Sequence, residues 1–168
     1  YRESELSAKD FLLSAMQKHI DCIAVTDHDS CNWIETLRTE LQNIEAENSN
    51  LYRELIIFPG VEIEVFPAIH LLALFDPQKP TDDISTVISR IQNGGNQVNF
   101  HEAVNLIQHS GGVAIPAHVD DAKGLFSTIE GSALKNVLDN CDFFAVEVTD
   151  PMYQLPQLCV DMNREFTY

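Results

Sequence analysis

Apolar residues recur along the chain at two spacings, one typical of helices and the other typical of strands. Spacings of three and four residues predict amphipathic helices over 6–19, 33–47, 81–91, 100–109 and around 134–138. Short apolar runs rich in β-branched residues predict strands over 21–26, 55–58, 61–65, 69–75, 113–117 and 143–148. Because strands and helices mostly alternate, the pattern predicts an α/β fold with a parallel sheet, and it favours a barrel over an open sheet.

Turn-forming residues separate these segments. Asn48-Ser49-Asn50 ends the second predicted helix, and Pro59-Gly60 is expected to turn one strand into the next. Asn93-Gly94-Gly95-Asn96 predicts a flexible break, and Gly111-Gly112 marks the end of a helix. The segment Val61–Val65 alternates apolar and acidic residues, which places its two glutamates on one face of a strand.

Several ionisable side chains stand on or at the ends of the predicted strands: Asp27, His28, Glu62, His70 and His118. A single histidine at a strand end is more often an ordinary loop residue, so the prediction depends on the set. Residues at the carboxyl ends of strands converge on the functional site in α/β proteins. Imidazole and carboxylate together suit zinc, manganese or iron. The sequence therefore predicts a divalent-metal site.

Charge and composition narrow the function further. The chain of 168 residues carries 26 acidic and 10 basic side chains, a formal net charge of −16. This balance argues against a basic groove for nucleic acid, although bound cations would still allow phosphate esters to bind. No apolar run reaches the ~18–20 residues of a membrane helix. Four cysteines without a C-x-x-C pair favour a reducing cytoplasm over a zinc knuckle.

Four short motifs follow one another in a specific order. They read TDHDS (Thr26–Ser30), PGVEIE (Pro59–Glu64), HLLAL (His70–Leu74) and PAH (Pro116–His118). Together they resemble the PHP (polymerase and histidinol phosphatase) family, and the resemblance runs from about residue 8 to residue 148. It implies a distorted (β/α)7 TIM-like barrel, incomplete in this chain, with two or three divalent ions at the strand ends. It also implies hydrolysis of phosphate mono- and diesters.

The resemblance implies a role for each candidate residue. His28 would be the metal-binding histidine of the second motif, and Glu62 the carboxylate that bridges two ions. His70 and His118 would be the metal-binding histidines that follow. Asp27 would orient the metal ligands without binding the ion itself. Such a site activates a water molecule for attack on phosphorus. The implied substrates are phosphorylated small molecules or nucleic-acid ends.

The sequence departs from the family pattern at three points. The first motif, His-x-His, and the closing motif, Asp-x-His, do not occur between Tyr1 and Tyr168, and Val119 replaces the usual proline after the third-motif histidine. We therefore interpret residues 1–168 as a single PHP-like domain, part of a longer protein. The segment HLLALFDP is most similar to members fused to an ATPase, so a fused ATPase domain is an expected partner.

Two alternatives stay open at this stage. A PHP-like module that has lost catalysis would act as a structural or partner-binding domain of a larger protein. An amidohydrolase-type barrel acting on C–N bonds would share the metal chemistry, but that family expects a lysine at a strand end. No predicted strand of this sequence ends in lysine.

Overall fold

Four strands form one sheet in the computed structural model, which describes residues 7–47 and 50–167. The strands lie side by side in chain order: β1 (Cys22–Val25), β2 (Ile56–Val65), β3 (Ile69–Leu74) and β4 (Val113–Pro116). β1 and β2 are parallel, whereas β2–β3 and β3–β4 are antiparallel. The predicted α/β class is confirmed. The predicted parallel sheet and TIM-like barrel are not seen in the described residues, where the sheet is mixed and open. Four strands are too few to close a barrel.

Most of the helices occur where the apolar spacing predicts them. They are α1 (Ala8–Gln17), α2 (Trp33–Ala46), α3 (Thr81–Gln92), α4 (Phe100–His109), α5 (Leu125–Thr128), α6 (Gly131–Asn140) and α7 (Gln157–Asp161), with a 3₁₀ turn η1 at Asn93–Gly95. α5 and α7 were not predicted, because helices of four and five residues are too short to show a helical spacing. Within the described ranges, no helix combines the length and the apolar character that a membrane crossing needs.

Two predicted features fall on residues outside the described part of the chain. Leu6, at the start of the first predicted helix, is one of them, and Asn48-Ser49, at the end of the second, is the other. The described start of α1 is set by Ser7, whose hydroxyl accepts a hydrogen bond from the backbone N–H of Asp10 at 3.1 Å. Such a side-chain cap satisfies one of the free N–H groups at a helix start.

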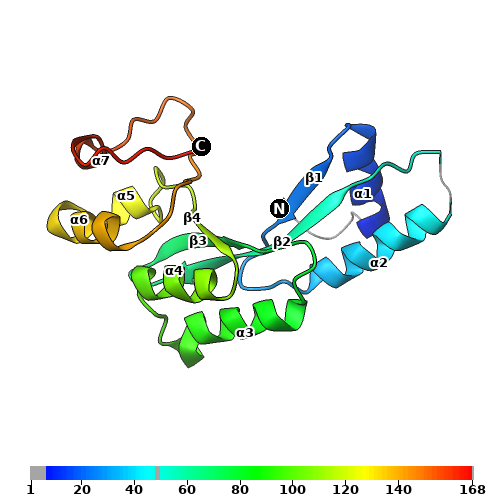
Figure 1. Ribbon diagram of the computed structural model, residues 1–168, viewed down its shortest axis with the longest axis horizontal. Helices are drawn as coiled ribbons and strands as arrows, with labels where there is room; N and C mark the ends of the chain where they lie inside the picture. Colours follow the sequence, from blue (N-terminus) through cyan, green and yellow to red (C-terminus); the bar gives the residue numbers. More distant parts are fainter. Residues whose placement is uncertain (1–6, 48–49, 168) are drawn as a thin grey trace.

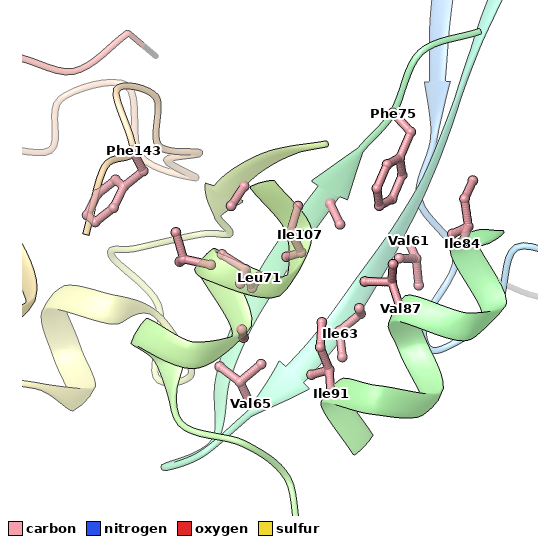
Figure 2. Close-up of a cluster of buried hydrophobic side chains, with 14 of the residues drawn as sticks. Val61, Ile63, Val65, Leu71, Phe75, Ile84, Val87, Ile91, Ile107 and Phe143 are labelled. Atoms are coloured by element: carbon pink, nitrogen blue, oxygen red, sulfur yellow. The ribbon is translucent and has the colours of Figure 1, made fainter. Parts of the chain in front are cut away.

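The helices are distributed unevenly along the sheet. α1 and α2 lie beside β1, α3 and α4 lie beside the remaining strands, and α5, α6 and α7 group together beyond β4 (Figure 1). The alternation in β2 buries Val61, Ile63 and Val65 completely. They pack against apolar side chains of α3 and α4 (Figure 2). Burial of each such side chain contributes about 1.5–3 kcal/mol to the stability of the fold. Because side chains alternate along a strand, the two glutamates of β2 lie on its other face.

Pro59 and Gly60 do not turn the chain, as the sequence had suggested, but lie inside the continuous strand β2. A β-carbon on Gly60 would lie 2.7 Å from Leu74 Cδ2 and 2.9 Å from Thr26 Cγ2, so glycine is needed there for close packing. Proline lacks a backbone N–H, and Pro59 stands where β2 changes its partner from β1 to β3. Both residues thus allow β2 to pair with two neighbouring strands.

The last predicted strand, 143–148, is not part of the sheet in the described structure. Its pairing is an isolated bridge between Ala145 and Thr167. The same segment also follows the end of β4, where Glu147 N–H donates to the carbonyl of Pro116 and Val119 N–H donates to the carbonyl of Glu147, each at 2.9 Å. Because β4 stops at Pro116 and the chain then turns, this pairing does not extend into a longer ladder.

Candidate metal centre

Four side chains converge at one place, each from the region of a different strand. Glu62 lies within β2 and His70 within β3, while His28 follows β1 and His118 follows β4. The backbone positions His28 next to Glu62, because Asp29 N–H donates to the carbonyl of Glu62 at 2.8 Å. The pairing of β1 with β2 therefore continues beyond the end of β1 and holds His28 alongside Glu62.

The cluster is centred on one carboxylate oxygen of Glu62. Glu62 Oε1 lies 2.7 Å from His70 Nδ1, 3.3 Å from His118 Nε2 and 3.5 Å from His28 Nε2. His70 Nδ1 and His118 Nε2 are 3.1 Å apart. The His70 ring meets the rings of His28 and His118 edge to face, with centroid distances of 5.3 and 4.9 Å. Three imidazole nitrogens thus lie within 3.5 Å of one carboxylate oxygen.

The cluster is enclosed on one side and open on the other. The side chains of His70, Glu62 and His118 are 11%, 14% and 19% exposed, whereas that of His28 is 65% exposed. The protected residues fix the geometry, because their neighbours restrict their movement. A molecule from solvent therefore reaches the cluster at the His28 side.

The donor atoms lie close enough together for one ion to bind several of them. Four ligands in a tetrahedron at about 2.0–2.1 Å from zinc stand roughly 3.3–3.4 Å from one another, so His70 Nδ1, at 2.7 Å from Glu62 Oε1 and 3.1 Å from His118 Nε2, would shift slightly outward around an ion. The ligand atoms of His28, Glu62 and His70 all lie within 4.8 Å of one another. His118 Nε2, at 3.3 Å from Glu62 Oε1, would add a third imidazole, and such a donor set suits zinc, manganese or iron alike. The structure thus contains a candidate metal site made of residues that the sequence had singled out.

The remaining predicted residue, Asp27, takes part through its backbone. Its carbonyl accepts a hydrogen bond from Glu62 N–H at 3.1 Å, which helps to align the two strands at the cluster. That its carboxylate orients the metal ligands stays a prediction, as does metal binding by His28, Glu62, His70 and His118.

A second carboxylate stands next to the cluster. Glu64 faces His70 across the β2–β3 pair, and its Oε2 lies 3.4 Å from His70 Nε2. The same oxygen accepts a hydrogen bond from Lys123 Nζ at 2.5 Å. The bond from Lys123 holds the pKa of the Glu64 carboxyl below its usual value, although burial acts in the opposite direction. Sequence analysis missed Lys123, which lies in a loop without any recognisable pattern.

Two acidic residues secure the turn at His118. Glu147 Oε2 accepts a hydrogen bond from the backbone N–H of His118 at 3.0 Å. The carboxylate of Asp120 accepts hydrogen bonds from the backbone N–H groups of Thr149 and Asp150 and from the Thr149 hydroxyl. Burial acts to raise the pKa of Asp120, but these hydrogen bonds outweigh it and lower the pKa to about 2. The segment 147–150 is thereby fastened to the chain that follows β4.

Comparison with known proteins gives a match among solved structures. No family model matches this chain, and no curated protein matches it. Among solved structures, it is similar to a crystal structure from Bifidobacterium adolescentis described as a "putative metal-dependent phosphoesterase". The TM-score is 0.62 at 12% sequence identity, and the alignment covers 95% of this chain and 79% of that one. The chain therefore has the fold of that phosphoesterase structure.

Proposed function

We propose that this protein is a metal-dependent phosphoesterase that hydrolyses phosphate monoesters or diesters. The observation that carries the proposal is the convergence of His28, Glu62, His70 and His118 on one point. The fold similarity to the bacterial phosphoesterase structure supports the same reaction class. The finer assignment, a PHP domain with two or three ions, rests on the four sequence motifs. It would require ligands beyond these four side chains.

Each residue of the cluster has a distinct task in this proposal. The three histidines would hold a divalent ion through the ring nitrogens that face Glu62, and the Glu62 carboxylate would hold the same ion or join it to a second one. A divalent ion supplies, when bound, the acidification of a coordinated water and the neutralisation of phosphate charge. The exposed side of His28 leaves space for the phosphate group to approach.

The charge of the chain makes a cation necessary for this chemistry. Two glutamates of β2 face the candidate site, and the protein carries a formal net charge of −16. A phosphate ester entering such surroundings would be repelled, whereas a divalent ion reverses the local potential. The proposed substrates are phosphorylated small molecules or nucleic-acid ends, both of which present an exposed phosphate.

The proposal is tested by hydrolysis of p-nitrophenyl phosphate and bis(p-nitrophenyl) phosphate. Protein stripped with a chelator should be inactive and should regain activity with Mn²⁺ or Zn²⁺. Glu62→Gln should lower kcat/KM by roughly 100-fold or more, since the ion contributes several kcal/mol of transition-state stabilisation. Glu102→Gln, at an exposed carboxylate in the first turn of α4, is the matched control and should leave kcat/KM unchanged.

Other results would contradict the proposal in different ways. Metal binding without hydrolysis of either ester would favour the alternative, a module that has lost catalysis and serves as a structural or partner-binding domain. Failure of the protein to bind Mn²⁺, Zn²⁺ or Fe²⁺ would exclude the proposed metal-dependent reaction.

A further inference from the structure

The imidazole of His70 lies between two carboxylates of the same strand. Its Nδ1 is 2.7 Å from Glu62 Oε1 in the cluster, and its Nε2 is 3.4 Å from Glu64 Oε2 on the other side. A neutral imidazole carries one N–H and one free lone pair, and an acceptor at either nitrogen decides which nitrogen keeps the proton. Glu62 is the closer acceptor, but an ion bound at Nδ1 would take the lone pair of that nitrogen, so the proton would then have to stay on Nε2, where Glu64 is the acceptor.

We propose that Glu64 is a positioning residue for His70, an inference that rests on the proposed metal site. Glu64 accepts a hydrogen bond from His70 Nε2–H, so that the proton stays on Nε2 and the lone pair of Nδ1 is directed at the ion. A hydrogen bond from the outer nitrogen of a metal-binding histidine to a carboxylate fixes both the tautomer and the orientation of the ring. Glu64 thus acts on the ion through His70 and does not itself bind it.

Lys123 holds this carboxylate in place. Its Nζ donates to the same oxygen, Glu64 Oε2, that faces His70. The backbone carbonyl of Lys123 also accepts a hydrogen bond from His70 N–H at 3.1 Å, so one loop residue anchors both partners. Among the lysines and arginines in residues 7–47 and 50–167, Lys123 alone forms an ion pair with an acid that contacts the cluster.

The same contacts argue against Glu64 as a further metal ligand. The oxygen nearest the cluster is already taken by the Lys123 ammonium and by the His70 ring. A second cation at that oxygen would have to displace the lysine. The two roles also predict different outcomes for glutamine, because an amide oxygen still accepts from Nε2–H but is a poor ligand for a divalent ion.

Zinc affinity, measured by competition with a chromophoric chelator, separates these roles. Glu64→Ala should weaken zinc binding by about 10–100-fold, as removal of such outer partners usually does. Glu64→Gln should bind zinc nearly as tightly as the unmodified protein, and Glu102→Ala should not change the affinity. Lys123→Met should weaken binding less than Glu64→Ala, and the double variant should be no weaker than Glu64→Ala alone, since both act through one path.

Nuclear magnetic resonance of the zinc-loaded protein gives a readout that does not depend on activity. The Nε2–H proton of His70 should be visible and protected from exchange in the unmodified protein and in Glu64→Gln, and it should exchange rapidly in Glu64→Ala. Equal zinc affinity for the unmodified protein and Glu64→Ala would overturn the positioning role while leaving the metal site intact. Equal losses in Glu64→Gln and Glu64→Ala would make Glu64 a ligand. Absence of zinc binding by the unmodified protein would overturn the site and the inference together.

Discussion

The carboxylate of Glu147 accepts a hydrogen bond from the backbone N–H of His118, with 3.0 Å between Oε2 and N. His118 has a φ of +30°, in the left-handed region that residues with a β-carbon rarely adopt and that costs on the order of 1 kcal/mol or more. This turn brings His118 Nε2 within 3.3 Å of Glu62 Oε1. A residue outside the cluster thus stabilises the backbone conformation on which one corner of the cluster depends.

Glu147→Ala should therefore weaken zinc binding while the protein remains folded. We expect a loss of about 0.5–1.5 kcal/mol in the free energy of unfolding, the usual contribution of one hydrogen bond. The weakening of zinc binding should be smaller than that caused by His118→Ala, which removes the ring itself. Zinc titration and urea denaturation measure the two effects. Glu165→Ala, at an exposed acid, is the control, and equal zinc affinities for Glu147→Ala and Glu165→Ala would refute the link.

Asp120 should make the stability of the protein depend on pH in the acid range. Its pKa is lowered from 3.8 to about 2 in the folded protein, so its ionised form stabilises the fold above pH 3.8 and this contribution is lost as the pH falls towards 2. Asp120→Asn should lower the free energy of unfolding at pH 7 by about 1–2 kcal/mol, through the lost charge-assisted hydrogen bonds. Urea denaturation at several pH values should show the difference from the unmodified protein shrinking between pH 3.8 and about 2. A constant difference across that interval would contradict the assignment.

Gly60→Ala should destabilise the sheet, because the new β-carbon would stand 2.9 Å from the carbonyl oxygen of Ala73 as well as against Leu74. Overpacking of this kind costs about 1–3 kcal/mol. Gly131→Ala is a useful comparison, since its site is open and only its left-handed φ of +56° is unfavourable. Thermal unfolding should show the larger loss for Gly60→Ala. An unchanged melting temperature would mean that Leu74 and Ala73 can move aside.

The histidines of the cluster should differ in what their removal does to the fold. His28→Ala should change the free energy of unfolding by no more than about 0.5 kcal/mol, as at other exposed positions, because its side chain is 65% exposed. Its zinc affinity should still fall by at least the roughly 10–100-fold expected for an outer partner. His70→Ala should lower both stability and zinc affinity, because His70 is buried. His101→Ala, at an exposed histidine of α4, is the control and should alter neither quantity. Undiminished zinc binding by His28→Ala would remove His28 from the site.

Local patterns in the sequence were sufficient to predict most helices and strands, and also which side chains of β2 share a face. The alternation of Val61–Val65 determines which side chains of β2 face the helices, and the structure confirms it. The apolar spacing of α4 predicted its bounds at Phe100 and His109. These features depend on neighbours only a few residues apart, and such neighbours are visible in a single sequence.

Features that depend on distant parts of the chain could not be predicted in this way. Pro59-Gly60 has the composition of a turn, but the partners that keep it extended lie on β1 and β3. Glu147 accepts a hydrogen bond from the His118 backbone from 29 residues further along the chain, and Lys123 pairs with Glu64 across 59 residues. The alternation of β2 had already placed Glu64 on the same face as Glu62, but nothing in the sequence showed that its carboxylate faces His70.

The wide separation of the cluster residues along the chain has a thermodynamic consequence. His28 and His118 are 90 positions apart in the sequence. In the sheet, β2 and β3 lie between β1 and β4, the strands that these two residues follow. An ion bound to both would act as a cross-link, since every unfolded conformation would have to break the link or keep a very long loop closed. The melting temperature of the protein should then rise with the logarithm of free zinc concentration, and chelators should act on it as reductants act on disulfide-bonded proteins.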